Sequence, residues 1–462
     1  MYDTIIIGAG MSGLAAGIRL AHYDQRVCIL DRHTTIGGLN SFYRLGGRNY
    51  DVGLHAVTNF TPKGTRKGPL ARLLRQLRFR WEDFALAPQI GSEIRFPSVT
   101  LRFGNDFEVF RSEVQRAFPG HKDEFERLLT RIVEYDDLDQ EMFDVSARQV
   151  LSETISEPLL IEMLLCPLMW YGNPREHDMV FGMFCIMFRS IFLEGLARPL
   201  AGVRLILRKL VRRFRELGGE LKLRSGVGRI KVEGGRATGV VLDDGQQLTG
   251  RQILSSAGWV ETMRMCEDIS DVDTEQAGKL SFVETISILD KPPEQLGMDR
   301  TLVFFNDSQR FDWCRPQQLC DARTGVICSP NNFAYPEGGL ADNVLRITAQ
   351  ANFDQWCGLS DHEYQLEKLK WYDRIQQSAV RFVPDYRHHV VDTDMFTPKT
   401  IRRFTWHDNG AVYGSPSKRL DGSTHLNNLH ICGTDQGFVG IIGAMFSGIS
   451  IANRCLITAP TR

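Results

Sequence analysis

A glycine motif close to the N-terminus constrains the fold of this chain more than any other feature. The apolar run at residues 4–7 is followed by three spaced glycines, and residues 14–20 have the apolar spacing of a helix. In such a strand–turn–helix unit the first glycine allows the turn, the second lets the backbone approach a pyrophosphate, and the third lets the helix pack on the strand. The motif reads Gly8-Ala9-Gly10-Met11-Ser12-Gly13, and we expect the free N–H groups at the helix start to bind a dinucleotide diphosphate.

A carboxylate follows at the position where a ribose would bind. The second apolar run, residues 26–30, ends in Asp31, about twenty residues past the motif, where an acidic side chain accepts hydrogen bonds from the adenosine ribose. We therefore predict an α/β fold with a Rossmann-like nucleotide-binding domain. A βαβ unit without a nucleotide is the alternative, and the complete match to the fingerprint argues against it.

The next residues carry a resemblance to a known family. A second glycine pair, Gly37-Gly38, follows the ribose carboxylate, and residues 51–55 read Asp-Val-Gly-Leu-His. The segment resembles the flavin-dependent carotenoid desaturase and isomerase group of the amine-oxidase-like flavoproteins, which have an acidic and a basic residue, then G-G-x-x-x-[ST], then fD-x-G-x-H. The resemblance implies FAD, not free NAD, as the cofactor. It also implies that FAD is bound here by Asp31, Arg32, Gly37, Gly38, Leu39, Asn40, Leu54 and His55.

Two later segments resemble other FAD-binding blocks of the same family. Residues 216–257 match its second block, which implies that Val227 contacts the adenine through its backbone and that Ala257 ends the block. Residues 428–452 match the last block. By this resemblance the turn from Gly433 to Asp435 meets the ribityl phosphate, and the final helix, beginning near Gly443 and Ala444, faces the flavin pyrimidine. The chain departs from the family where Ile442 replaces the usual proline.

The resemblance implies a two-dinucleotide-binding-domain flavoprotein with an inserted α+β substrate domain. We expect the FAD-binding domain to comprise residues 1–60, 201–269 and 425–462, and the substrate domain to comprise residues 61–200 and 270–424. Within the second domain, residue patterns predict a hairpin over residues 100–110, and strands at residues 283–289, 301–305, 344–351 and 387–391. They also predict helices at residues 159–165, ending near Pro167, and at residues 361–380.

Residues 179–193 form the most apolar predicted helix, with methionine and phenylalanine on all sides. A helix that is apolar all round is either buried or faces something apolar that is not protein. Three interpretations therefore stay open: a core helix, the wall of a channel for a flexible hydrocarbon, or a face that contacts a membrane.

Composition excludes several classes of function. The chain has 55 Lys and Arg against 56 Asp and Glu, so no overall field favours nucleic acid. The ten cysteines form no C-x-x-C pair, and we predict no metal site; His388 and His389 would point to opposite faces of a strand. The first strand starts at once, which leaves no room for a signal peptide, and no apolar stretch reaches the roughly 18 residues of a membrane span. We expect a cytoplasmic protein, and the family resemblance implies that it associates peripherally with the inner face of the membrane.

Nothing in the chain resembles a nucleophile–base pair, a metal cage or a P-loop lysine, and flavin chemistry needs none of them. The resemblance implies an FAD-dependent enzyme that oxidises CH–CH bonds of a long isoprenoid polyene, such as a carotenoid- or squalene-type molecule taken from the bilayer. Its electron acceptor, oxygen or a quinone, stays open. His55 is a candidate substrate-side catalytic residue, with a structural hydrogen-bonding role as the alternative.

Other functions stay open. A reduced-FAD-dependent cis/trans isomerase and a saturase would need the same cofactor. An amine-oxidase-like enzyme would need an aromatic cage that Cys432 and Phe438 do not obviously supply. A lipid-binding flavoprotein without activity would retain the same FAD segments.

Overall fold

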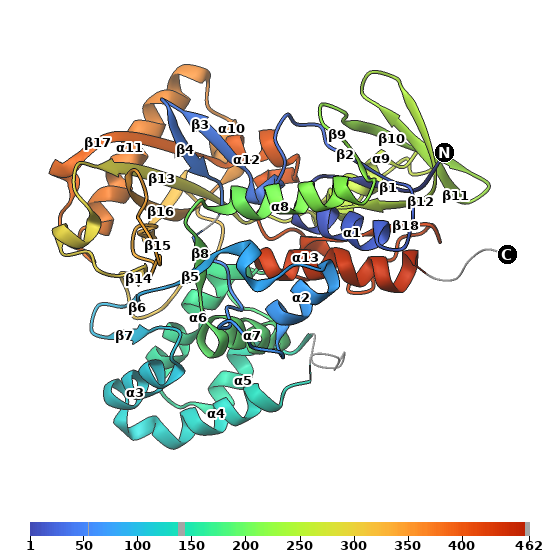
Figure 1. The fold of residues 1–462 in the computed structure, drawn as a ribbon. Helices are drawn as coiled ribbons and strands as arrows, with labels where there is room; N and C mark the ends of the chain where they lie inside the picture. Colours follow the sequence, from blue (N-terminus) through green and yellow to red (C-terminus); the bar gives the residue numbers. More distant parts are fainter. Residues whose placement is uncertain (54, 137–143, 458–462) are drawn as a thin grey trace.

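The computed structural model describes residues 1–53, 55–136 and 144–457 (Figure 1). Its first sheet has the strand order β10-β11-β12-β1-β2-β9, with β18 also paired to β12. The pairings of β1 with β2 and β12, of β2 with β9 and of β12 with β18 are parallel, which matches the predicted Rossmann-like core. The strands are β1 (Tyr2–Ile7), β2 (Val27–Leu30), β9 (Glu220–Lys222), β10 (Val227–Glu233), β11 (Arg236–Leu242), β12 (Gln247–Ser255) and β18 (Leu429–Ile431).

Three helices pack on this sheet: α1 (Met11–Ala21), α8 (Val203–Glu216) and α13 (Gly440–Ile451). A fourth, α2 (Pro69–Leu77), lies against α13 and α1 and buries its leucines in the same core. Its leucines recur at helical spacing and match the apolar surface of α1 and α13, so residues 69–77 share the apolar core of the first sheet. On the other face of the sheet lies α9 (Trp259–Met265).

The second sheet has the order β17-β13-β16-β15-β14-β6-β7. Its pairs are antiparallel except for β14 with β6. The strands are β6 (Ser92–Arg95), β7 (Thr100–Phe103), β13 (Ser281–Leu289), β14 (Leu302–Asn306), β15 (Cys320–Cys328), β16 (Asn343–Ala351) and β17 (Val390–Phe396). The long helix α11 (Asp361–Ala379) covers one face, and the predicted positions of β13, β14, β16 and α11 agree with the structure.

Short elements connect the two sheets. Two small two-stranded sheets pair β3 (Phe42–Leu45) with β4 (Arg48–Asp51), and β5 (Leu86–Pro88) with β8 (Ala197–Pro199). The helices α10 (Phe353–Cys357) and α12 (Pro398–Thr405) lie in contact with each other.

A helical body lies below the two sheets in Figure 1. It contains α3 (Phe107–Ala117), α4 (Lys122–Glu134), α5 (Ala147–Thr154), α6 (Pro158–Gly172) and α7 (Phe181–Phe188). Aromatic and aliphatic side chains of all five helices form the largest apolar core. Phe181, Phe184 and Phe188 of α7 are fully buried in it, which favours the core interpretation of the apolar helix.

Three local predictions were wrong. Residues 107–110 begin a helix and not the second strand of a hairpin, because Asp106 caps α3 by accepting from the Glu108 N–H. The helix α6 continues through Pro167, which the prediction used as its end. His388 lies in a 3₁₀ turn, Arg387–His389, that precedes β17.

Within the described part of the chain, no helix is both long and apolar enough to cross a bilayer.

The aromatic core of the helical body should dominate its stability. The Phe110 ring is fully buried and stacks on Phe192 with ring centroids 4.2 Å apart, whereas the neighbouring Val109 side chain is 41 % exposed. We expect Phe110→Ala to lower the free energy of unfolding by about 3–5 kcal/mol, and Val109→Ala to change it by about 0.5 kcal/mol or less. Denaturant unfolding of both variants checks this; equal losses would contradict the burial argument.

Candidate functional site

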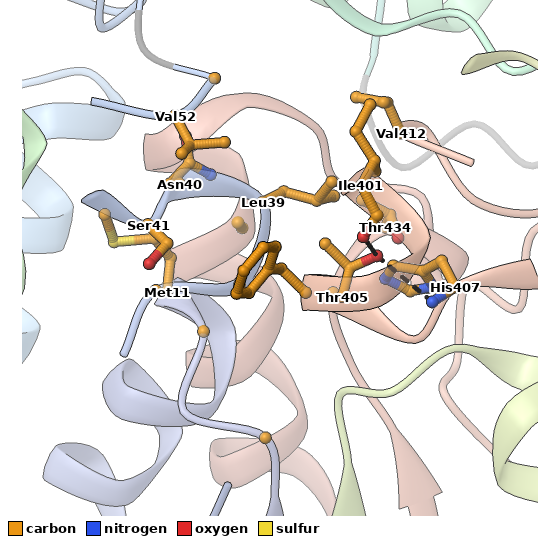
Figure 2. A pocket seen from close by; sticks show the side chains of 18 of the residues that line it. Met11, Leu39, Asn40, Ser41, Val52, Ile401, Thr405, His407, Val412 and Thr434 are labelled. Atoms are coloured by element: carbon orange, nitrogen blue, oxygen red, sulfur yellow. Dashed lines mark hydrogen bonds between the residues drawn. The ribbon is translucent and has the colours of Figure 1, made fainter. Parts of the chain in front are cut away.

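A cavity of about 730 Å³ joins the first sheet to the second. We call it the central cavity. It runs from the β1–α1 turn at Gly8 to Phe282 on β13, and its size suits a cofactor or small-molecule site. Figure 2 shows Met11, Asn40 and Ser41 on one side and Thr405 and His407 on the other.

The β1–α1 turn forms a cradle at one end of the cavity. A Cβ on Gly10 would meet no heavy atom within 4 Å, so open space lies where the fingerprint requires backbone to approach a pyrophosphate. A Cβ on Gly13 would lie 2.1 Å from the Gly8 carbonyl oxygen. The start of α1 has no side-chain cap, which leaves its N–H groups to a ligand. These features fit the diphosphate of FAD.

Asp31 and Arg32 lie next to this cradle. The Asp31 carboxylate accepts hydrogen bonds from the Ala9 N–H (2.8 Å) and the His33 N–H (2.9 Å), which fix it at the cavity wall. Arg32 donates to the Val227 carbonyl (2.9 Å), and its guanidinium lies 3.9 Å from the centroid of the Trp406 ring. These contacts thus hold together the residues that were predicted to bind the ribose and the adenine of FAD.

Most of the residues predicted from the sequence lie on the central cavity. Those that line it are Gly8, Gly10, Met11, Ser12, Asp31, Arg32, Gly37, Gly38, Leu39, Asn40, His55, Val227, Ala257, Gly433 and Ala444. Leu54 lies outside the described residues.

Three predicted residues do not line the cavity. Gly13 is packed against Gly8, as the motif requires for helix–strand contact. Asp435 is buried and accepts from the Trp259 N–H (2.6 Å) and the Ser415 N–H (2.7 Å), so it holds the turn beside the cavity. Gly443 lies inside α13, because the helix begins at Gly440, earlier than the sequence indicated.

The far end of the cavity is apolar and aromatic. The rings of Trp170 and Phe282 lie 5.3 Å apart, and those of Phe282 and Tyr413 lie 5.6 Å apart. Val326, Val412, Tyr171, Phe438 and Val439 complete this compartment. Among the described residues of 179–193, none lines the cavity; Trp170 and Tyr171 of α6 form this part of the wall instead.

A polar cluster interrupts this apolar wall. Glu284 on β13 and Thr348 on β16 are register partners, and both line the cavity with His55. The His55 Nε2 atom lies 3.0 Å from Thr348 Oγ1 and 3.4 Å from Glu284 Oε2. Glu284 also pairs with Arg346, and both side chains are 3 % exposed. Burial raises the pKa of Glu284, but the charge of Arg346 and the contacts with His55 outweigh it and lower that pKa to about 2.

His407 is another titratable residue of the cavity wall. Burial lowers its pKa, but the hydrogen bond and charge of Glu261, together with Asp435 and Asp408, outweigh burial, so its pKa is raised. The His407 Nδ1 atom lies 3.6 Å from Glu261 Oε1.

The sequence did not predict several residues that line the cavity, nor Arg346, which pairs with the lining residue Glu284. Glu284 and Arg346 carried a usable signal, since each is the only charged residue within its apolar strand. A charge in a buried strand must find a partner, and the two strands were both predicted. Trp170, Phe404, Trp406 and His407 carried no such signal.

In two places the fold brings a histidine to a pair of potential metal ligands that is distant from it in sequence. His177, Asp312 and Cys314 place one ligand atom each within 4.8 Å of one another, as do Cys266, Asp268 and His425. No short-range spacing in the sequence indicates either trio.

The comparisons with known proteins agree with this geometry. Residues 6–77 match the model of an NAD(P)-binding Rossmann-like domain. The chain is 23 % identical over 504 residues to the chloroplastic prolycopene isomerase 2 of an Oncidium hybrid cultivar, covering 98 % of this chain and 83 % of that protein. It is 24 % identical over 292 residues to a 4,4'-diapophytoene desaturase of Methylomonas, covering 56 % and 54 %.

A solved structure shows the same fold. The crystal structure of an oxidoreductase from Methanosarcina mazei superposes with a TM-score of 0.68 at 16 % identity, covering 98 % of this chain and 100 % of the other. The predicted Rossmann-like architecture is thereby confirmed.

The two glycines of the turn should respond differently to an added methyl group. Gly10→Ala has space for its Cβ in the protein, so we expect a folded chain whose FAD affinity falls by about tenfold or more, because the methyl occupies diphosphate space. Gly13→Ala collides with the Gly8 carbonyl, so the larger loss should be in the unfolding temperature. FAD titration and thermal unfolding of both variants distinguish the two effects. Unchanged FAD affinity in Gly10→Ala would contradict the placement of the diphosphate.

The raised pKa of His407 predicts a pH-dependent stability. Its contribution is present below the unfolded-state pKa of about 6.5 and is lost as pH rises through the higher native pKa. We expect the wild-type free energy of unfolding to fall relative to that of His407→Gln as pH rises above about 6.5. Denaturant unfolding across this range checks it, with exposed His388→Gln as control. If the free energy of unfolding of His407→Gln changed with pH in the same way as that of the wild type, His407 could not be the source of the pH dependence.

Proposed function

We propose that this chain, an FAD-dependent flavoprotein of the carotenoid desaturase and isomerase-like family, dehydrogenates a long isoprenoid polyene. One observation carries the proposal: the central cavity joins the diphosphate cradle at Gly10 to an aromatic compartment around Trp170 and Phe282. A hydrocarbon in that compartment would share one enclosed space with the cofactor. The names of the two relatives, an isomerase and a desaturase of polyenes, support the same substrate class.

The chain supplies binding, orientation and a dry compartment. When bound, FAD supplies a hydride acceptor for oxidation of a C–C bond. The start of α1 and the glycine turn are suited to the diphosphate, and Asp31 to the ribose. The start of α13 at Gly440 lies on the cavity, where its dipole would stabilise negative charge. Phe282 and Tyr413 provide flat apolar surfaces that would align a conjugated chain and exclude water.

We assign FAD binding to the predicted residues that line the cavity, with Gly13 and Asp435 in supporting positions. The presence of two separate sheets supports the proposed division into an FAD-binding domain and a substrate domain, and we place α2 in the former because it packs in the core of the first sheet. The substrate domain would then supply the aromatic compartment through α6 and β13.

A reduced-FAD-dependent cis/trans isomerase is the second candidate. The similarity to a prolycopene isomerase over 98 % of this chain favours it. The same cavity would serve both reactions, since each requires a polyene beside a flavin.

The substrate class also favours a peripheral association with the membrane. Long polyenes partition into bilayers, so a cytoplasmic enzyme would collect them at the inner membrane surface. The helix α2 has a basic outer face, with exposed Arg75 next to exposed Arg78, which would favour anionic lipid. Oxygen or a membrane quinone would then reoxidise the flavin.

The proposal predicts flavin reduction by a hydrocarbon. We expect anaerobic mixing of the oxidised protein with linear polyenes in anionic liposomes to bleach the flavin and shift the polyene absorption to longer wavelength. The two signals should appear together, because each new double bond reduces one flavin. Stopped-flow absorbance with product chromatography measures both, and protein without FAD is the control.

Two other results would contradict desaturation. Isomer exchange only after the flavin has been pre-reduced would establish the isomerase instead. No change of flavin or polyene in either redox state would refute the polyene substrate.

A further inference from the structure

The polar cluster on the cavity wall holds one histidine ring in a defined orientation. His55 Nε2 faces two oxygens, Thr348 Oγ1 at 3.0 Å and Glu284 Oε2 at 3.4 Å. Thr348 in turn donates its hydroxyl proton to Glu284 Oε2 at 3.2 Å. Because a carboxylate only accepts and the Thr348 proton is already committed, the proton between them and the ring must belong to Nε2.

Glu284 and Arg346 form a buried ion pair beside the ring, and each side chain is only 3 % exposed. The imidazole tautomer that carries its proton on Nε2 has a lone pair on Nδ1.

The other ring nitrogen is available to a ligand. No hydrogen bond joins His55 Nδ1 to another residue in the described part of the chain, and His55 lines the central cavity. An imidazole oriented by a carboxylate, with its second nitrogen free, is the arrangement of a general base. The other candidate role of His55 is a purely structural hydrogen bond, and that role does not need a second ring nitrogen free on the cavity side.

We propose that His55 Nδ1 accepts the substrate proton in the dehydrogenation, and that Glu284 and Thr348 are positioning residues that keep the ring proton on Nε2. This rests on the proposed function. The proton leaves one carbon for Nδ1, and the electron pair of that C–H bond forms the new C=C bond. The neighbouring carbon loses a hydride to the oxidised flavin, so the substrate loses two hydrogens and two electrons, and the flavin is reduced.

The kinetic test uses the FAD-loaded protein and a linear polyene in liposomes under anaerobic conditions. We expect His55→Gln and His55→Ala, both saturated with FAD, to slow flavin reduction by about 10²-fold or more, with an unfolding temperature close to wild type. Imidazole in the buffer should partly restore the rate of His55→Ala only. Thr348→Val should slow the reaction less than either. His389→Gln should not slow it, since His389 pairs with Asp290 outside the cavity (2.9 Å).

The second readout needs no turnover. Nitrogen-15 NMR of ring-labelled histidines, with the His55 signals identified by their loss in His55→Gln, should show the proton on Nε2 in the oxidised holoprotein. Glu284→Gln should weaken this preference, because a neutral amide stabilises the Nε2–H tautomer less than a carboxylate does. Should Glu284→Gln not fold, with Arg346 left unpaired, Thr348→Val gives the same comparison.

The outcomes are distinct. A wild-type rate with normal flavin bleaching in His55→Gln would overturn the proton acceptor and leave the proposed function intact, as would a ring proton found on Nδ1. Absence of bleaching in the wild type would overturn the proposed function, and the proton acceptor with it.

Discussion

A carboxylate can lie in the wall of an apolar cavity only if an opposite charge is buried beside it. In this protein Glu284 meets that condition through Arg346, and the antiparallel pairing of β13 with β16 places the two together. The same pairing sets Thr348 beside Glu284 and so fixes His55. Polar chemistry at the aromatic end of the cavity therefore depends on one buried ion pair in the second sheet.

The first sheet supplies the other half of the site through close backbone contacts. Gly13 lies so near Gly8 that only a glycine fits, and this contact sets the start of α1 against β1. The open space at Gly10 follows from the same turn. A rigid glycine turn on one sheet and a buried ion pair on the other thus face a common cavity.

The sequence predicted the parts of the site that are local. The turn from Gly8 to Gly13 and the carboxylate of Asp31 follow from spacing within about thirty residues, so a fingerprint could find them. The extent of α13 was harder, because apolar residues on both sides of Gly443 give no clear start. The apparent hairpin at residues 100–110 failed because the Asp106 cap outweighed the alternating pattern.

The rest of the site depends on tertiary contacts between distant segments. His55 and Thr348 are separated by 293 positions, and Glu284 and Arg346 by 62. No sequence periodicity relates residues so far apart. The one visible signal was the single charged residue in each of two apolar strands, Glu284 and Arg346. The aromatic wall at Trp170 also could not be predicted, because an apolar helix has the same composition in a core as beside a cavity.

The most direct test of the proposed site is a crystal structure of the oxidised protein with FAD and a polyene analogue that cannot be dehydrogenated. We expect the diphosphate at Gly10, the polyene against Trp170 and Phe282, and its reacting carbon within about 3.5 Å of His55 Nδ1. A polyene bound outside the central cavity, or a His55 side chain turned away from it, would refute the proposed site.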